Sequence, residues 1–233
     1  MKVKKKITKK KLKQPDEFIS FTEQSFLFMT KHSKQIAIGV AIVLVLVLSF
    51  VLFRMWNQKK EDEAQQRLAI ALEAYQMASS PYREGLPEEY KRALEGFEEV
   101  IKSFSGTRSA RLSLLYKGGI HLRLGEFDEA IKAYETFLKK VGKEKFYQLL
   151  ALEGLGYAYE GKKDYEKALK AYEEIIKQGD SFDRAGAHLY LARCYERVGN
   201  NDEAIRHYNH FLQISPKSFF TNPVLRKVSL LEK

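Results

Sequence analysis

The chain contains a single cysteine in 233 residues, so neither an intrachain disulfide nor a cysteine-based zinc site can form. Five prolines and fourteen glycines are too few for a loop-rich or collagen-like chain. With 45% hydrophobic and 30% charged residues, it is neither a polar disordered tail nor a multi-span membrane protein. What remains is a mostly helical protein with a net charge of +10.

The basic excess lies before a long uncharged run. Residues 1–34 hold ten lysines and three acidic residues, whereas residues 54–233 hold 30 basic and 27 acidic residues. Residues 36–53 carry no charge. As a helix this run measures about 27 Å, close to the roughly 30 Å hydrocarbon core of a bilayer. We predict a transmembrane helix over residues 35–56; a buried core helix is the alternative.

The flanks of this run predict its topology. It is longer than the apolar region of a cleaved signal peptide, and no small-residue cleavage site follows it, so we expect an uncleaved signal anchor. Lysines precede the run closely, whereas acidic and basic residues mix after it. The positive-inside rule therefore places residues 1–34 in the cytoplasm and exports residues 57–233.

Within the basic segment before the anchor, residues 16–32 show a regular spacing of apolar side chains. These side chains recur at helical spacing, which predicts an amphipathic helix at the membrane surface. The residues on this face are Phe18, Phe21, Ser25, Phe28 and Met29. An unstructured retention signal is the alternative. The lysines at residues 2–13 favour anionic lipid; without an aromatic or arginine pattern, we predict no nucleic-acid binding.

The exported part contains an internal repeat. Ala130, Ala168 and Ala204 occupy equivalent places in three similar stretches, 38 and 36 residues apart, and Ala93 marks a weaker fourth copy. A small residue precedes each of the first three alanines by twelve positions. These small residues are Gly118, Gly156 and Ala192.

The pattern resembles the tetratricopeptide repeat, in which small residues let two helices approach and aromatic residues fill the groove between hairpins. One copy carries the full set of Leu152, Leu155, Gly156, Tyr159, Tyr165, Ala168 and Tyr172. The resemblance implies an all-α protein: a single transmembrane helix followed by a tetratricopeptide-type α-solenoid of about four helical hairpins. We expect Asn222 and Pro223 to open a short capping helix.

No group of residues predicts catalysis. His207 and His210 share a helix face, but no carboxylate or cysteine set completes a metal site, so packing or solvated histidines are expected. Cys194 is expected to be a small buried hydrophobic residue. We predict no enzymatic activity, no metal and no cofactor.

Repeat geometry instead predicts a partner-binding groove lined by the first helix of each hairpin. The candidate residues are Leu115, Gly119, Leu122, Arg123, Glu153, Tyr157, Glu160, Leu189, Arg193, Glu196 and Arg197. This mixed lining suits an extended segment or a helix of another protein. Gly119, Tyr157 and Arg193 stand where co-chaperone repeats that capture a C-terminal carboxylate carry asparagine, so that specialised mode is not expected.

The whole layout is similar to the YfgM-like family of bacterial inner-membrane tetratricopeptide proteins. The shared features are the DEFISFTEQ stretch at residues 16–24, a span containing Gly39, and the aromatic exit at Phe53 and Trp56. The resemblance implies a location in the inner membrane with a periplasmic C-terminal domain, and association with translocon subunits and periplasmic folding factors. The lysine-rich start departs from the more acidic start of the best-known member.

The leading hypothesis is therefore a non-enzymatic, membrane-anchored scaffold that binds proteins. One alternative is an envelope-assembly or cell-division organiser that bridges periplasmic proteins. Another, from a different class, is a small-molecule-binding accessory domain of an enzyme complex. A fourth is a protein that acts through lipid or nucleic-acid binding by its lysine tail.

Overall fold

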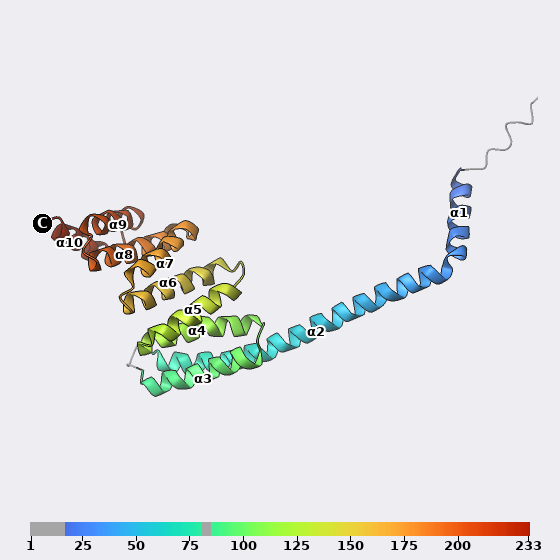
Figure 1. Cartoon of the computed structure of the whole chain (residues 1–233), viewed down its shortest axis with the longest axis horizontal. Helices are drawn as coiled ribbons and strands as arrows, with labels where there is room; N and C mark the ends of the chain where they lie inside the picture. The colour runs from blue at the N-terminus through green and yellow to red at the C-terminus, as the bar shows by residue number, and fades with distance from the viewer. Residues whose placement is uncertain (1–16, 81–84) are drawn as a thin grey trace, which may run out of the picture. The chain divides into compact units, whose positions relative to one another are not determined.

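The structure is a computed structural model that describes residues 17–80 and 85–233. The described residues form helices joined by turns, without a strand (Figure 1). The chain divides into two compact units, Met1–Asn57 and Gln58–Lys233. The predicted all-α class is thus confirmed, while the lysine tract at residues 2–13 lies outside the described residues.

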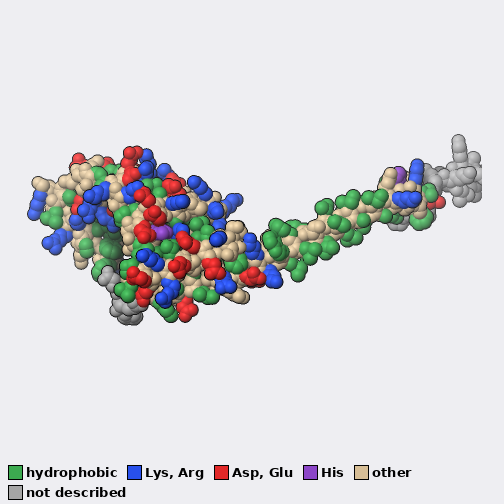
Figure 2. Space-filling view, turned by 60° about the horizontal axis from the view of Figure 1, so that its bottom comes forward, with side chains coloured by type: hydrophobic (Ala, Val, Ile, Leu, Met, Phe, Trp, Pro, Cys, Tyr) green, Lys and Arg blue, Asp and Glu red, His purple; other side chains and the backbone are tan. Residues whose placement is uncertain are grey.

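The first unit contains α1 (Glu17–Lys31) and the beginning of α2 (Ser33–Ala78). α1 covers the segment for which an amphipathic helix was expected; the side chains of Phe18 and Phe21 lie outside the described ones. The apolar side chains of α2 before residue 57 are exposed and form a continuous hydrophobic surface (Figure 2). Within the described ranges, α2 is the one helix long and apolar enough to cross a membrane.

The second unit is a series of helical hairpins (Figure 1). After the remainder of α2, its helices are α3 (Pro87–Ser103), α4 (Arg108–Leu124), α5 (Phe127–Lys140), α6 (Lys145–Gly161), α7 (Tyr165–Gln178), α8 (Ser181–Arg197), α9 (Asn201–Ile214) and α10 (Thr221–Leu231). Hairpins pair α2 with α3, α4 with α5, α6 with α7 and α8 with α9, and α10 packs on α9. This arrangement matches the predicted number of hairpins.

The repeat residues explain why the two helices of a hairpin pack closely. A Cβ atom on Gly118 would lie 2.7 Å from the ring of Tyr134, and one on Gly156 would lie 2.3 Å from the ring of Tyr172. The glycine of the first helix therefore makes room for the tyrosine of the second. All three aligned alanines of the second helices are fully buried. Small and aromatic residues together form one core that continues from hairpin to hairpin.

Local signals set the helix ends. The side chains of Thr107, Asp164 and Asn200 each accept a hydrogen bond from a backbone N–H in the first turn of the following helix. Gly125 ends α4 in the left-handed conformation, with φ of 73°, which glycine adopts without a steric penalty. These caps satisfy backbone groups that the helices cannot pair internally.

The capping helix begins earlier than expected. α10 begins at Thr221 with Phe220 in the cap position, so Asn222 is not its cap and Pro223 is its third residue. A proline fits there because the first N–H groups of a helix have no partner within the helix. Val224 and Val228 on α10 are buried against the last hairpin.

Candidate protein-binding groove

A groove lies between α6 and α8 and encloses about 360 Å³. Its walls are largely apolar. They are formed by Phe146, Leu149, Leu150, Ile175, Ala185, Leu189, Phe211 and Phe220, with Ser215 and Ser218 at the turn before α10. Phe146 is 67% exposed and Leu150 is 39% exposed. Large apolar side chains on the wall of an open groove are typical of a surface that another molecule covers.

Four of the residues predicted from the repeat geometry meet in this groove. Glu153 and Tyr157 line it from α6, and Leu189 and Arg193 line it from α8. Phe146, Leu150, Glu153 and Tyr157 follow one another at spacings of four, three and four residues, which is one face of a helix. The same face of α6 therefore supplies both the apolar wall and the polar groups.

The polar groups are held by stacking. The Arg193 guanidinium lies over the rings of Tyr157 and Tyr190, 5.2 and 5.5 Å from their centroids. The two rings are 5.2 Å apart, and the Tyr190 hydroxyl donates to Glu153 at 2.7 Å. Burial raises the pKa of Tyr190, so its hydroxyl keeps its proton and remains a donor.

A carboxylate fixes the arginine from the other side. The carboxylate of Glu160 accepts a hydrogen bond from Arg193 Nε at 3.0 Å. It accepts a second one from Nη2 of the same guanidinium, so the contact is bidentate. The Tyr172 hydroxyl donates to the same carboxylate at 2.6 Å. Burial alone would lower the pKa of Arg193, but hydrogen bonding to Glu160 and the charge of that residue raise it. Arg193 is thus a fixed, permanently charged part of the groove.

The lining of the groove carries one acidic and one basic side chain, Glu153 and Arg193. Arg193 is matched by Glu160, whereas Glu153 has a tyrosine hydroxyl as its hydrogen-bond donor. The arrangement can therefore accept an apolar segment with a cationic or amide group opposite Glu153. It offers oriented hydrogen-bonding groups to a ligand.

The predicted residues of α4 lie elsewhere. Leu115 and Leu122 are partly buried and pack on the core that α4 and α5 share with α6. A Cβ atom on Gly119 would lie 3.7 Å from the Tyr134 hydroxyl oxygen. The Arg123 guanidinium lies 6.0 Å from the ring centroid of Tyr90, which ties α4 to the first hairpin. None of these four lines the groove between α6 and α8.

The remaining predicted residues lie near the end of α8. Glu196 accepts a hydrogen bond from the Tyr208 hydroxyl at 2.9 Å. It also forms an ion pair with Lys227 on α10. These contacts join α8, α9 and α10. Arg197 is exposed and does not line the groove.

Phe146, Leu150, Tyr190 and Phe220 are among the groove residues that sequence reasoning missed. The helical spacing from Phe146 to Tyr157 carried a signal for the first two. Tyr190 precedes Arg193 by three residues on α8 and shares its face. Phe220 had no such signal, because the turn before α10 brings it to the groove.

The histidines form a packed cluster on α8 and α9. His207 is buried, its Nδ1 lies 2.8 Å from Nδ1 of His188, and its ring stacks on Tyr195 at 5.4 Å. Burial, followed by the positive charge of neighbouring groups, lowers the pKa of both histidines to about 4. Across the described side chains, no set of three histidine, cysteine or acidic residues is arranged to hold a metal ion. Cys194 is buried, as predicted, and burial raises its pKa to about 12.

Comparison with known proteins identifies the repeats. Residues 88–144, 117–183 and 154–219 each match the tetratricopeptide repeat profile, and together they extend over more than half of the chain. Lipopolysaccharide assembly protein B of Escherichia coli strain K12 is 26% identical over 156 residues, which is 65% of this chain and 36% of that protein. The chain thus spans about a third of the length of the curated relatives that it matches.

Solved structures share the fold. A tetratricopeptide repeat protein from Parabacteroides merdae aligns with a TM-score of 0.57 and 18% identity over 72% of this chain and 60% of that chain. MamA of Desulfovibrio magneticus aligns with a TM-score of 0.54 and 16% identity over 70% of this chain and 82% of that chain. The prediction of a long apolar helix followed by tetratricopeptide hairpins is confirmed.

Proposed function

Because the chain belongs to the tetratricopeptide repeat family, we propose that it is a non-enzymatic scaffold whose groove between α6 and α8 binds partner proteins. Tetratricopeptide domains typically bind proteins rather than catalyse reactions. The observation that carries the proposal is the combination of exposed apolar walls with an arginine fixed by Glu160, Tyr157 and Tyr190. Preorganised polar groups reduce the entropy lost on binding, and they give an apolar groove its specificity.

We further propose that residues 35–56 of α2 anchor the protein in the bacterial inner membrane. Residues 1–34 then lie in the cytoplasm, where their lysines set the orientation, and residues 57–233 lie in the periplasm. Confinement to the membrane raises the effective concentration of the groove toward membrane-bound partners. The similarity of this layout to the YfgM-like family supports translocon subunits and periplasmic folding factors as those partners.

A second candidate function is an organiser of envelope assembly. The identity of 26% to lipopolysaccharide assembly protein B favours it, because that protein is named for assembly of an envelope component. The two functions use the same groove and differ in the partner. The composition of the purified complex separates them.

The test compares two variants of the full-length protein purified from membranes in detergent. Leu150→Asp places a charge in the groove wall, whereas Val198→Asp changes an exposed apolar residue in the turn after α8, away from the groove. We expect the wild type and Val198→Asp to retain translocon subunits, and Leu150→Asp to lose them. Retention of every partner by Leu150→Asp would contradict the assignment of the groove. Recovery of lipopolysaccharide-assembly proteins in their place would select the second candidate.

A further inference from the structure

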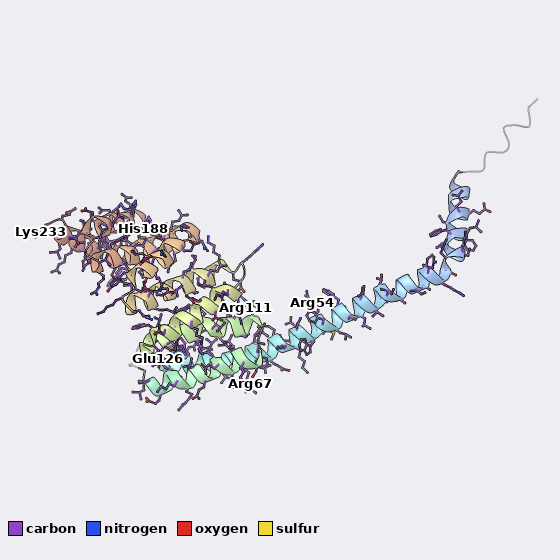
Figure 3. All side chains as sticks on the ribbon, in the orientation of Figure 1. Arg54, Arg67, Arg111, Glu126, His188 and Lys233 are labelled. Carbon is purple, nitrogen blue, oxygen red and sulfur yellow. The ribbon has the colours of Figure 1, made fainter. Side chains whose placement is uncertain are left out.

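The two edges of the hairpin series carry opposite charge. We define the proximal edge as the turns between hairpins with four helical residues on either side, namely 100–111, 137–148, 175–184 and 211–224. The distal edge is the corresponding set of turns within hairpins, described over 75–80, 85–90, 121–130, 158–168 and 194–204. Figure 3 labels Arg111 on the first and Glu126 on the second, at opposite ends of α4.

The proximal edge is strongly basic. Its described side chains include two acidic residues, Glu144 and Asp180, against ten basic ones. The basic residues are Lys102, Arg108, Arg111, Lys139, Lys140, Lys143, Lys145, Lys177, Arg184 and Lys217, of which all but Arg111 are exposed. Glu144 pairs with Arg108 at 2.8 Å and with Arg111 at 3.7 Å, so even this carboxylate is shared between two cations.

The distal edge has the opposite balance. It carries five basic residues against eleven acidic ones among its described side chains. The acidic residues are Glu88, Glu89, Glu126, Asp128, Glu129, Glu160, Asp164, Glu166, Glu196, Asp202 and Glu203. Acidic residues at the start of a second helix suit its positive end, which accounts for many of them. Lysines at the end of a second helix likewise suit its negative end. The helix dipole does not explain the lysines that lie within the turns.

Exposed aromatic rings accompany the basic residues. Phe146, Phe219 and Phe220 are 67%, 89% and 50% exposed, and all three belong to the proximal edge. Phe146 and Phe220 also line the groove, whereas Phe219 does not. Basic side chains interspersed with exposed aromatic rings are the composition of surfaces that bind the interface of an anionic bilayer.

The chain enters the second unit at this same edge. Glu61 lies five residues after Trp56 in α2, and its carboxylate accepts the N–H groups of Arg108 and Ser109 at the start of α4. Five helical residues measure about 8 Å. The contact with the proximal edge therefore follows closely, along the chain, after the predicted end of the transmembrane segment. Lys60 Nζ also donates to the carbonyl of Ser105 in the turn between α3 and α4.

We propose that the proximal edge docks on the anionic phospholipid surface of the membrane that holds α2. The proposal rests on the membrane anchor stated above and goes beyond it, because an anchor by itself leaves the hairpins free to tilt. Basic residues within a Debye length of about 8 Å are attracted to the headgroups at physiological salt. α4 has 17 residues and is therefore about 25 Å long, which keeps the acidic distal edge outside that range.

The two ends of α9 offer a direct test. Gln213 lies at its proximal end and Asn201 at its distal end, and both are exposed. Cysteines introduced there can be labelled while Cys194 stays in place, because Cys194 is buried. The full-length protein is placed in nanodiscs of phosphatidylcholine, with or without phosphatidylglycerol, that contain a lipid with a nitroxide headgroup. The readout is quenching of the attached fluorophore.

With phosphatidylglycerol, we expect the probe at position 213 to be quenched about threefold more than the probe at 201, and the difference to disappear at about 1 M salt. The double variant Lys139→Glu/Lys140→Glu should lower the docked-to-undocked ratio by about thirtyfold or more. Lys162→Glu/Lys163→Glu makes the same charge change on the distal edge and should leave the quenching unaltered. Thermal unfolding of both double variants checks that they fold.

Equal quenching at the two positions in anionic discs would overturn the proposal. So would binding of a polyglutamate peptide to the proximal edge while position 213 stays unquenched, since that result assigns the edge to an acidic protein. Failure of the chain to enter the disc is seen separately by size-exclusion chromatography. It would contradict the anchor and, with it, the docking.

Discussion

The carboxylate of Glu61 on α2 accepts both the backbone N–H of Ser109, at 3.0 Å, and its hydroxyl, at 2.7 Å. The N–H of Arg108 donates to the same carboxylate at 2.6 Å. A side chain 48 positions earlier in the chain thus satisfies the first backbone donors of α4. This contact holds the part of α2 that belongs to the second unit against the start of the second hairpin.

Removal of this carboxylate should destabilise the second unit. Glu61→Ala leaves backbone donors of α4 without their partner, and we expect a loss of about 1–3 kcal/mol in the free energy of unfolding. Chemical unfolding of the full-length protein in detergent micelles, followed by circular dichroism, measures it. Glu63→Ala alters an exposed carboxylate one residue beyond Asp62 and is the matched control. Equal stability of the two variants would mean that the Glu61 contact contributes nothing.

Two adjacent glycines should respond in opposite ways to alanine. Gly118→Ala places a methyl group 2.7 Å from the Tyr134 ring, and we expect a loss of about 1–3 kcal/mol from overpacking. Gly119→Ala places a methyl group 3.7 Å from the Tyr134 hydroxyl oxygen, an ordinary contact distance, and should gain up to about 1 kcal/mol from helix propensity. The thermal midpoints of the two variants measure the contrast. A gain in Gly118→Ala would refute the close packing of α4 on α5.

The histidine cluster should make stability depend on pH. His188 and His207 have pKa values of about 4 in the folded protein, below the ordinary 6.5, so the unfolded chain binds more protons between these values. Stability is therefore full above about pH 6.5 and falls as the pH drops toward 4. His207→Phe keeps a ring against Tyr195 and should reduce the change in thermal midpoint between pH 7 and pH 5.

Other charged groups also influence this pH dependence, and their contribution must be separated from that of the histidines. Arg206 lowers the pKa of His207, and Glu203 raises it. Burial would raise the pKa values of Glu61 and Glu196, but hydrogen bonds from Ser109 to the first and from Lys227 and Tyr208 to the second lower them below their ordinary value. His32→Asn changes a half-buried histidine before the apolar run, outside the second unit, and should keep the wild-type slope. A slope unchanged in His207→Phe would exclude the cluster as its source.

The proposed topology predicts the activity of reporter fusions. Alkaline phosphatase folds into an active enzyme only where its disulfides form, which is outside the cytoplasm. A fusion after Lys233 should be active in intact bacteria, and a fusion after Lys34 should be inactive. The reverse result would place the repeats in the cytoplasm and exclude periplasmic partners.

Much of the fold could be predicted because its determinants are local and repeated. Gly118 and Ala130 lie twelve residues apart, and the same relation recurs in the next two hairpins. Each pair indicates that one helix packs closely on the next, so the helical hairpins could be predicted from the sequence alone. The start of α10 was misplaced by two residues, because an asparagine followed by proline also fits inside the first turn.

The groove was only partly predictable, because it depends on contacts across repeats. Tyr157 and Arg193 were found from their positions on the first helices, and they do meet. Leu115 and Leu122 occupy comparable positions, yet they pack on the core that α4 and α5 share with α6 and do not line the groove. The contact between Glu61 and Ser109 had no sequence signal, since neither residue belongs to the repeat pattern.

Site-specific photocrosslinking from position 150 in intact bacteria tests the scaffold function most directly. A photoreactive residue there lies in the groove wall, while the same residue at position 198 reports collisions with the exposed surface. The scaffold function predicts a discrete adduct with a translocon subunit or a periplasmic folding factor from position 150 and none from position 198. The same adducts from both positions, or no protein adduct from position 150, would contradict it.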